Sequence, residues 1–154
     1  MLDSMFMKFT FTIGNETVHA NLSEALKIDI SSPEVIAEQL RDNAELCTYW
    51  GTVAEHAMAL YQTAQLDFDM WYAERYKETK IRLIEEFGKS GLTEGQIKNE
   101  IMLTYGEDYK RNINNVRKAE FRKRVLSVAK TGFDKKQEAL VNLLSFYKKE
   151  KERV

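Results

Sequence analysis

One long helical seam constrains this chain more than any other feature of its sequence. Between Ser32 and Phe87 the only glycine is Gly51, and the only proline is Pro33 at the very start. This spacing keeps one side of an α-helix facing a partner helix. The seam residues, mostly apolar or small, alternate steps of four and three: Ile36, Leu40, Asn43, Cys47, Trp50, Ala54, Ala57, Tyr61, Ala64, Phe68 and Trp71.

Helix-end signals predict that this helix covers residues 32–88. The segment Ser31-Ser32-Pro33-Glu34 combines a capping serine, a proline suited to the first turn and an acid suited to the positive helix end. Gly88-Lys89-Ser90-Gly91 is a typical stop. At 1.5 Å per residue the helix would be about 80 Å long. The chain is therefore expected to be elongated and to find partners along this helix, from its own chain or from other copies.

Two further helices follow in the sequence. Thr93-Glu94-Gly95-Gln96 matches a capping box and opens a short helix over residues 93–105, which Gly106 closes. Glu107-Asp108 then places negative charge at the start of a basic helix over residues 107–152. Apolar residues recur every seven positions in this last helix, as in coiled coils. They are Leu126, Phe133, Leu140 and Tyr147.

The N-terminal segment Met5–Leu22 predicts a β-hairpin that turns at Gly14-Asn15, with Ile28–Ile30 as an optional third strand. An isolated hairpin is marginal in water. We expect it to cover helix ends, or alternatively to pair its edge with a neighbouring subunit. Because the seam begins only at Ile36, the helical body is expected to fold without residues 1–22.

The predicted fold class is therefore mainly α: an elongated long-helix hairpin, coiled-coil-like, with a short connecting helix and an N-terminal β-hairpin. Residues 1–31 form the hairpin region and residues 32–154 the helical body. A length of 154 residues with 44% hydrophobic residues indicates one soluble domain. The chain lacks an apolar run long enough for a membrane span and a signal-peptide pattern, so no membrane association and a cytoplasmic location are expected.

Charge is distributed unevenly along the sequence. The net charge is −1, yet residues 107–154 hold 14 Lys/Arg and 7 Asp/Glu, whereas residues 1–106 hold 9 and 17. A basic C-terminal third on a neutral protein indicates a polyanion or an acidic partner. The single cysteine, Cys47, lies on the seam and is interpreted as a buried small residue, with a reactive thiol as the alternative.

Catalytic and metal-binding patterns are weak. The two histidines, His19 and His56, lie far apart, and the spacing Glu16/His19 falls on a predicted strand, where the two side chains point to opposite faces. No phosphate-binding glycine loop or serine-elbow motif occurs. We expect a protein that is not an enzyme and that has no cofactor and no metal site. The alternative is a Mg²⁺-dependent nucleotide hydrolase using the acidic pairs Asp67/Asp69 and Glu74/Glu78.

A second apolar stripe in the basic helix indicates homo-oligomerisation, because one stripe suffices for packing within the chain. The predicted oligomerisation residues, taken from both stripes, are Phe121, Val125, Val128, Phe133, Leu140 and Leu144.

Basic and aromatic residues give the strongest functional signal. In the basic helix, cations recur on one side at Lys110, Arg117 and Arg124, a spacing that suits a phosphate backbone. In the long helix, rings alternate with cations, as in single-strand-binding sites. The predicted nucleic-acid-binding residues are Tyr72, Arg75, Tyr76, Lys77, Lys110, Arg111, Arg117, Lys118, Arg122, Arg124, Lys135 and Lys136.

The order of these features resembles phage recombination mediator proteins of the UvsY type. The resemblance covers roughly residues 45–150 and rests on Tyr49-Trp50, on Trp71-Tyr72-Ala73-Glu74-Arg75-Tyr76 and on Gly132-Phe133-Asp134-Lys135-Lys136. It implies a non-catalytic helical oligomer, often a ring, that binds single-stranded DNA. Such a protein helps a RecA-like recombinase replace a single-strand-binding protein. By position, Arg75 matches the family's basic DNA-binding motif, with Lys77 beside it.

The sequence thus predicts a single-stranded DNA-binding recombination mediator that acts in recombination and repair, in the infected host cell if the chain is phage-encoded. A structural coiled-coil adaptor or scaffold without nucleic-acid binding is the alternative.

Overall fold

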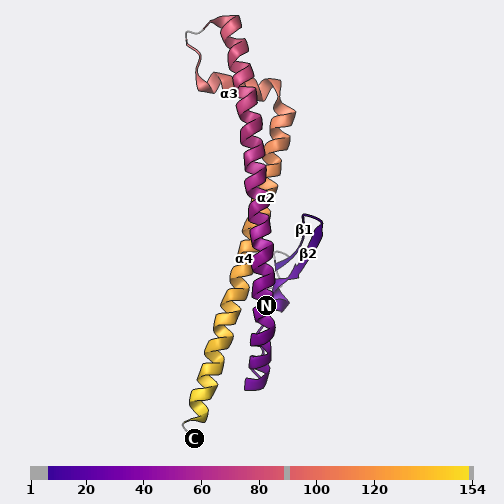
Figure 1. Cartoon of the computed structure of the whole chain (residues 1–154), viewed down its shortest axis with the longest axis vertical. Helices are drawn as coiled ribbons and strands as arrows, with labels where there is room; N and C mark the ends of the chain where they lie inside the picture. The colour runs from indigo at the N-terminus through magenta and orange to yellow at the C-terminus, as the bar shows by residue number, and fades with distance from the viewer. Residues whose placement is uncertain (1–6, 89–90, 153–154) are drawn as a thin grey trace. The chain divides into compact units, whose positions relative to one another are not determined.

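A computed structural model describes residues 7–88 and 91–152 of the chain. Its elements follow the order β1 (Lys8–Ile13), β2 (Glu16–Asn21), α1 (Leu22–Ala25), α2 (Pro33–Phe87), α3 (Glu94–Thr104) and α4 (Gly106–Lys151), as Figure 1 shows. The predicted fold class is confirmed in its elements: two long helices that pack against each other, a short helix between them and an N-terminal β-hairpin.

The helix boundaries follow the local signals in the sequence closely. The Ser32 hydroxyl accepts a hydrogen bond from the Val35 amide (3.2 Å), and so caps α2 where the sequence places a cap. At the other end Gly88 adopts a positive φ of 82°, which a residue with a Cβ rarely reaches. Thr93 and Gln96 form the predicted capping box of α3.

The chain divides into two compact units, and both contain parts of α2 and α4. The first, which we call the hairpin unit, comprises Met1–Ala57 and Arg122–Val154; the second, the turn unit, comprises Met58–Phe121. This division differs from the predicted one at residues 31/32, because the β-hairpin packs into the same unit as the ends of both long helices.

Aromatic rings form the centre of the hairpin unit. The rings of Trp50 in α2 and Phe133 in α4 stack with centroids 5.5 Å apart and an interplanar angle of 7°. Phe9 of β1 meets Trp50 edge to face at 6.0 Å. Val18 and Leu22 are buried in the same cluster, so the hairpin contributes directly to the core. The expectation that it merely covers helix ends is therefore revised.

Polar contacts fix the alignment of α2 and α4 within the hairpin unit. The buried Asn43 amide donates hydrogen bonds to the Phe133 carbonyl (3.0 Å) and to the Gln137 side chain (2.9 Å). Lys136 Nζ donates to the Ala25 carbonyl at the end of α1 (2.8 Å). These contacts tie α4 both to the seam of α2 and to the segment that follows the hairpin.

Residues 28–30 do not form the optional third strand. The Gln39 side chain accepts a hydrogen bond from the Asp29 amide (2.9 Å) and donates one to the Asp29 carbonyl (2.6 Å). A side chain of α2 therefore satisfies the backbone groups that a neighbouring strand would otherwise pair.

The turn unit has a smaller buried core, formed where α2, α3 and the start of α4 meet. Leu83, Ile97 and Ile101 are its buried centre. Half-buried rings surround that centre, and Phe68 and Trp71 of α2 pack against Tyr109 of α4. The residues predicted to line the seam of α2 are all buried or half-buried in the two units, which confirms the seam.

Two predicted oligomerisation residues need correction. Phe133 and Leu140 are 1% and 0% exposed, because the heptad-spaced side of α4 packs against other segments of its own unit. They have no surface left for a second copy, and we remove them from the predicted association surface.

Candidate nucleic-acid interface

Arg75, the predicted centre of the nucleic-acid site, is engaged within its own unit. Its guanidinium pairs with the Glu78 carboxylate (2.6 Å) and lies 5.2 Å from the centroid of the Tyr105 ring. Contact with Tyr105, followed by the charge of Glu78, raises the pKa of Arg75 above its usual value. The side chain is 28% exposed, so a phosphate would have to compete with these partners.

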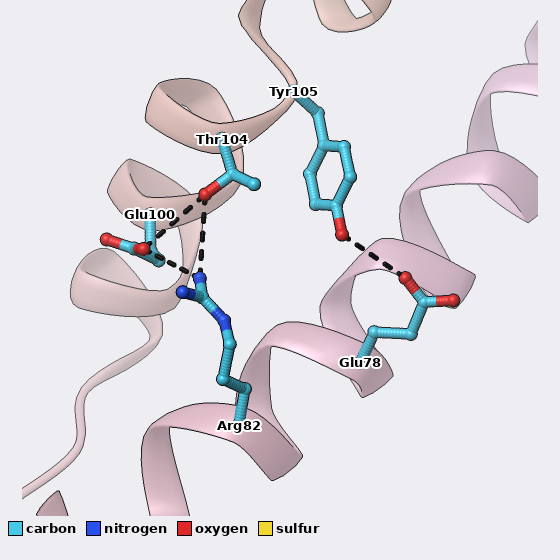
Figure 2. A network of polar contacts seen from close by, with 5 residues as sticks. All are labelled: Glu78, Arg82, Glu100, Thr104 and Tyr105. Carbon is cyan, nitrogen blue, oxygen red and sulfur yellow. Dashed lines mark hydrogen bonds and ion pairs between the residues drawn. The ribbon is translucent and has the colours of Figure 1, made fainter. Parts of the chain in front are cut away.

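A second set of contacts holds the end of α3 against α2. Arg82 Nη2 donates to the Glu100 carboxylate (2.6 Å) and to the Thr104 hydroxyl (3.5 Å). One turn away the Tyr105 hydroxyl donates to Glu78 (3.4 Å). Figure 2 shows these contacts, in which Arg82 joins α2 to α3.

The predicted stacking rings of α2 are also used internally. Tyr72 and Tyr76 are half-buried against the core of the turn unit, and their ring centroids lie 6.3 Å apart. Burial raises the pKa of the Tyr72 hydroxyl. Lys77 is exposed, and it is the Lys80 ammonium that lies over the Tyr76 ring, 5.9 Å from its centroid. Tyr72 and Tyr76 therefore contribute to the packing of the turn unit.

The best-formed basic surface in the turn unit lies on α4. We call it the α4 cationic face, and it consists of Lys110, Arg111, Asn114, Arg117 and Lys118, all exposed. These positions follow the spacing of one helix side; Val116, on the opposite side of the helix, is buried, and the half-buried Ile113 borders the face. The same folding that buries one side of α4 thus presents the other to solvent.

The charges of this face are only lightly paired. Lys110 contacts Glu107 (3.2 Å) and Arg111 contacts Asp108 (2.7 Å), each through an exposed pair within one turn. Such pairs contribute little and are easily exchanged for another anion. Within residues 7–88 and 91–152, Arg117 and Lys118 have no carboxylate within ion-pair distance.

Phe121 continues the α4 cationic face at its C-terminal end. It lies three and four residues after Lys118 and Arg117, on the same helix side, and its ring is 61% exposed. Sequence reasoning assigned Phe121 to oligomerisation and missed its alignment with the cations. The signal was present in the spacing of residues 110, 114, 117 and 121. Proteins that bind single-stranded nucleic acids combine aromatic rings, on which bases stack, with cations that contact the phosphates.

The predicted cations of the hairpin unit are less uniform. Arg124 and Lys135 are exposed, and Lys135 pairs with Glu138 (2.9 Å). Arg122 is half-buried. Lys136 is held by the Ala25 carbonyl, and burial lowers the pKa of its ammonium group. Lys136 is therefore a structural contact in this unit and not part of an open basic surface.

The charge asymmetry of the sequence cancels within each unit. The hairpin unit contains 13 Lys/Arg and 13 Asp/Glu, and the turn unit contains 10 and 11. The basic helix folds beside the acidic half of the chain, so a long-range positive field is absent. Attraction of a polyanion would depend on the local α4 cationic face.

The remaining predicted oligomerisation residues differ in exposure. Val128 is 69% exposed, whereas Val125 and Leu144 are half-buried in the hairpin unit. Of the predicted oligomerisation residues in this unit, Val128 is therefore the one most open to a second copy.

Neither a metal site nor a membrane-spanning helix is found among the described residues. The described residues contain no group of three or more His, Cys, Asp or Glu side chains placed to hold a metal ion. None of the described helices combines the length and apolar character needed to cross a membrane. No protein-family model, curated protein or solved structure matches this chain.

Proposed function

We propose that this protein binds single-stranded DNA through the α4 cationic face and acts, without enzymatic activity, as a recombination mediator. One observation carries the binding part. Lys110, Arg111, Arg117 and Lys118 stand on one exposed side of a helix whose opposite side is packed, and two of them lack an ion-pair partner in the described chain. Phosphates spaced along a strand fit such a row of cations.

Phe121 supplies the preference for single strands in this proposal. Unpaired bases have open faces that stack on an exposed aromatic ring, whereas paired bases stack on one another. The phosphate contacts of Arg117 and Lys118 would carry no base information, so binding should be largely independent of sequence. The role in loading a RecA-like recombinase onto DNA coated with single-strand-binding protein rests on the resemblance to the UvsY type.

A structural adaptor is the second candidate function. The near-neutral charge of each unit and the internal use of Arg75 and Arg82 favour it, because both reduce what is left for a polyanion. An adaptor would use the same long helices as a frame for protein contacts and would not respond to DNA.

The first prediction separates these functions by the salt dependence of binding. Fluorescence anisotropy of a labelled oligo(dT) should show binding that weakens steeply as salt rises. The double change Arg117→Ala/Lys118→Ala should lower the log–log slope by about 1.4, since each phosphate contact on a single strand contributes about 0.7. Phe121→Ala should weaken binding to single strands more than to duplex.

Matched variants serve as controls. Lys148→Ala/Lys149→Ala removes the same charge from exposed positions near the end of α4, and Phe146→Ala removes another exposed ring. Equal losses in the test and control variants would contradict a specific face, and an absence of binding at low salt would leave the adaptor. If DNA binds but recombinase assembly on coated DNA is not accelerated, the mediator role fails and the binding site stands.

A further inference from the structure

The part of α2 within the turn unit carries an apolar line on its solvent side. Leu66, Met70 and Ile81 are 58%, 58% and 49% exposed, and Ala73 and Lys77 continue the same helix side between them. This side lies opposite Phe68, Tyr72 and Thr79, which face inward. Exposed apolar side chains scattered singly are ordinary, but a line along one helix face marks an interaction surface.

Opposite charges flank this line at its two ends. Asp69 and Lys80 are exposed, and because they lie eleven residues, or about three turns, apart, both border the same edge of the line. Gln65 donates a hydrogen bond to Asp69 (3.0 Å), and the Lys80 ammonium lies 5.9 Å from the Tyr76 ring centroid. Within the described residues neither has an ion-pair partner.

The charges and apolar residues along this side of α2 are complementary to those of a second, antiparallel copy of the same helix. An antiparallel copy of the helix places Leu66 against Ile81 of the second copy and Asp69 against Lys80 of the second copy, with each contact made twice. A parallel copy would not bring Asp69 near Lys80, because the two residues would stay about three turns apart along the paired helices. A two-fold symmetric contact uses the same surface on both copies, so that each residue pair across the contact occurs twice.

The middle of the line permits close approach of two helices. The exchange of Leu66 with Ile81 centres between residues 73 and 74, and that of Asp69 with Lys80 one residue further along, between residues 74 and 75. Ala73 is small and exposed, so helix axes can approach to the usual distance of about 8–10 Å. The Glu74 carboxylate lies 3.8 Å from the Arg75 guanidinium of its own chain, which reduces repulsion between two copies.

We infer that α2 of the turn unit binds α2 of a second copy of this chain, antiparallel, about a two-fold axis close to Ala73 and Glu74. Lys77 packs its aliphatic stem on Met70 of the second copy and keeps its ammonium in solvent. This contact differs from the one predicted along α4 and does not depend on DNA binding, which the α4 cationic face would carry.

Cysteine cross-linking tests the axis and the direction. In a Cys47→Ser background, Ala73→Cys should form a disulfide-linked dimer under mild oxidation, seen on a non-reducing gel. Gln62→Cys, exposed on the same helix three turns away, should stay monomeric, because an antiparallel partner places it far from its own copy. Dimers of both variants would show a parallel contact, and dimers of neither would show no contact here; each result overturns the inference.

Charge exchange tests the register independently of cross-linking. By sedimentation, Asp69→Lys and Lys80→Asp should each weaken the dimer by about tenfold, because each sets like charges against each other. The double variant restores opposite charges and should recover the unmodified affinity. Failure of the double variant to recover, with helical circular dichroism unchanged, overturns the register, and an unmodified chain that is monomeric at micromolar concentration overturns the contact.

Discussion

The hairpin unit and the turn unit contain parts of the same two helices but are stabilised differently. In the hairpin unit the β-hairpin closes over stacked Trp50 and Phe133, and the side chains at the centre are almost completely buried. In the turn unit the large rings stay half-buried, and ion pairs such as Arg82–Glu100 join the helices at the surface.

The difference shows how much a third layer contributes to a pair of helices. Two helices alone bury one narrow side of each, which leaves the edges of large rings in water. Where a sheet covers those edges, apolar burial dominates, at roughly 25 cal/mol per Å². Where no sheet covers the ring edges, partly exposed polar contacts join the helices instead, and each of these contacts is weak.

The largest expected effect comes from opening the covered core. Phe133→Ala should lower the free energy of unfolding by about 3–5 kcal/mol, through lost burial and the cavity left beside Trp50. The matched control is Phe146→Ala, an exposed ring of the same helix, which should change it by less than about 0.5 kcal/mol.

The two tryptophans allow this effect to be assigned to one unit. Trp50 lies in the hairpin unit and Trp71 in the turn unit, so Trp71→Phe and Trp50→Phe backgrounds each report on a single region. We expect Phe133→Ala to shift the denaturant transition of Trp50 more than that of Trp71. Equal shifts would show that the two units unfold together.

An intermediate effect is expected from the buried polar group of the hairpin unit. Asn43→Ala removes the donor to the Phe133 carbonyl and to Gln137, and should cost about 1–3 kcal/mol because the Phe133 carbonyl stays buried. Asn142→Ala, at an exposed position of α4, is the control. Chemical denaturation followed by Trp50 fluorescence measures both. A loss of unfolding free energy no larger than that of the control would mean that water takes over the hydrogen bonds that the Asn43 amide donates.

The smallest effect is expected in the turn unit. Arg82→Met removes the ion pair with Glu100 at an exposed position, and should cost no more than about 1 kcal/mol. High salt should reduce this cost further, which denaturation followed by Trp71 fluorescence would reveal. Lys98→Met, an exposed lysine of α3, provides the comparison. A cost as large as that of Phe133→Ala would show that the network outweighs the apolar core of its unit.

Much of the fold follows from local sequence signals. Ser32, Gly88 and the capping box of Thr93 and Gln96 act within a few residues of themselves, so the helix ends could be placed within one residue. The seam of α2 repeats over many turns, which makes its direction clear. The hairpin turn at Gly14, with φ of 61°, has the same local character.

The site was harder to predict because it depends on what each side chain meets across the fold. Arg75 and Tyr76 look like ligand-binding residues in the sequence. In the structure Arg75 contacts Glu78 of its own helix and the Tyr105 ring that follows α3, and Tyr76 packs against the core that α3 completes. Lys136 belongs to a basic run but binds the Ala25 carbonyl, 111 positions earlier. Residue spacing identifies the side of a helix, and it does not reveal which segment covers that side.

The hydrogen bond from Asn43 to Phe133 has a consequence for the entropy of loop closure. It joins residues 90 positions apart, whereas the Arg82–Glu100 contact joins residues only 18 apart. Closing the longer loop costs about 1.4 kcal/mol more in chain entropy, since the cost grows with the logarithm of loop length. If the contacts around α3 form first, they shorten the loop that remains to be closed between Asn43 and Phe133, and so lower the entropy cost of that second step.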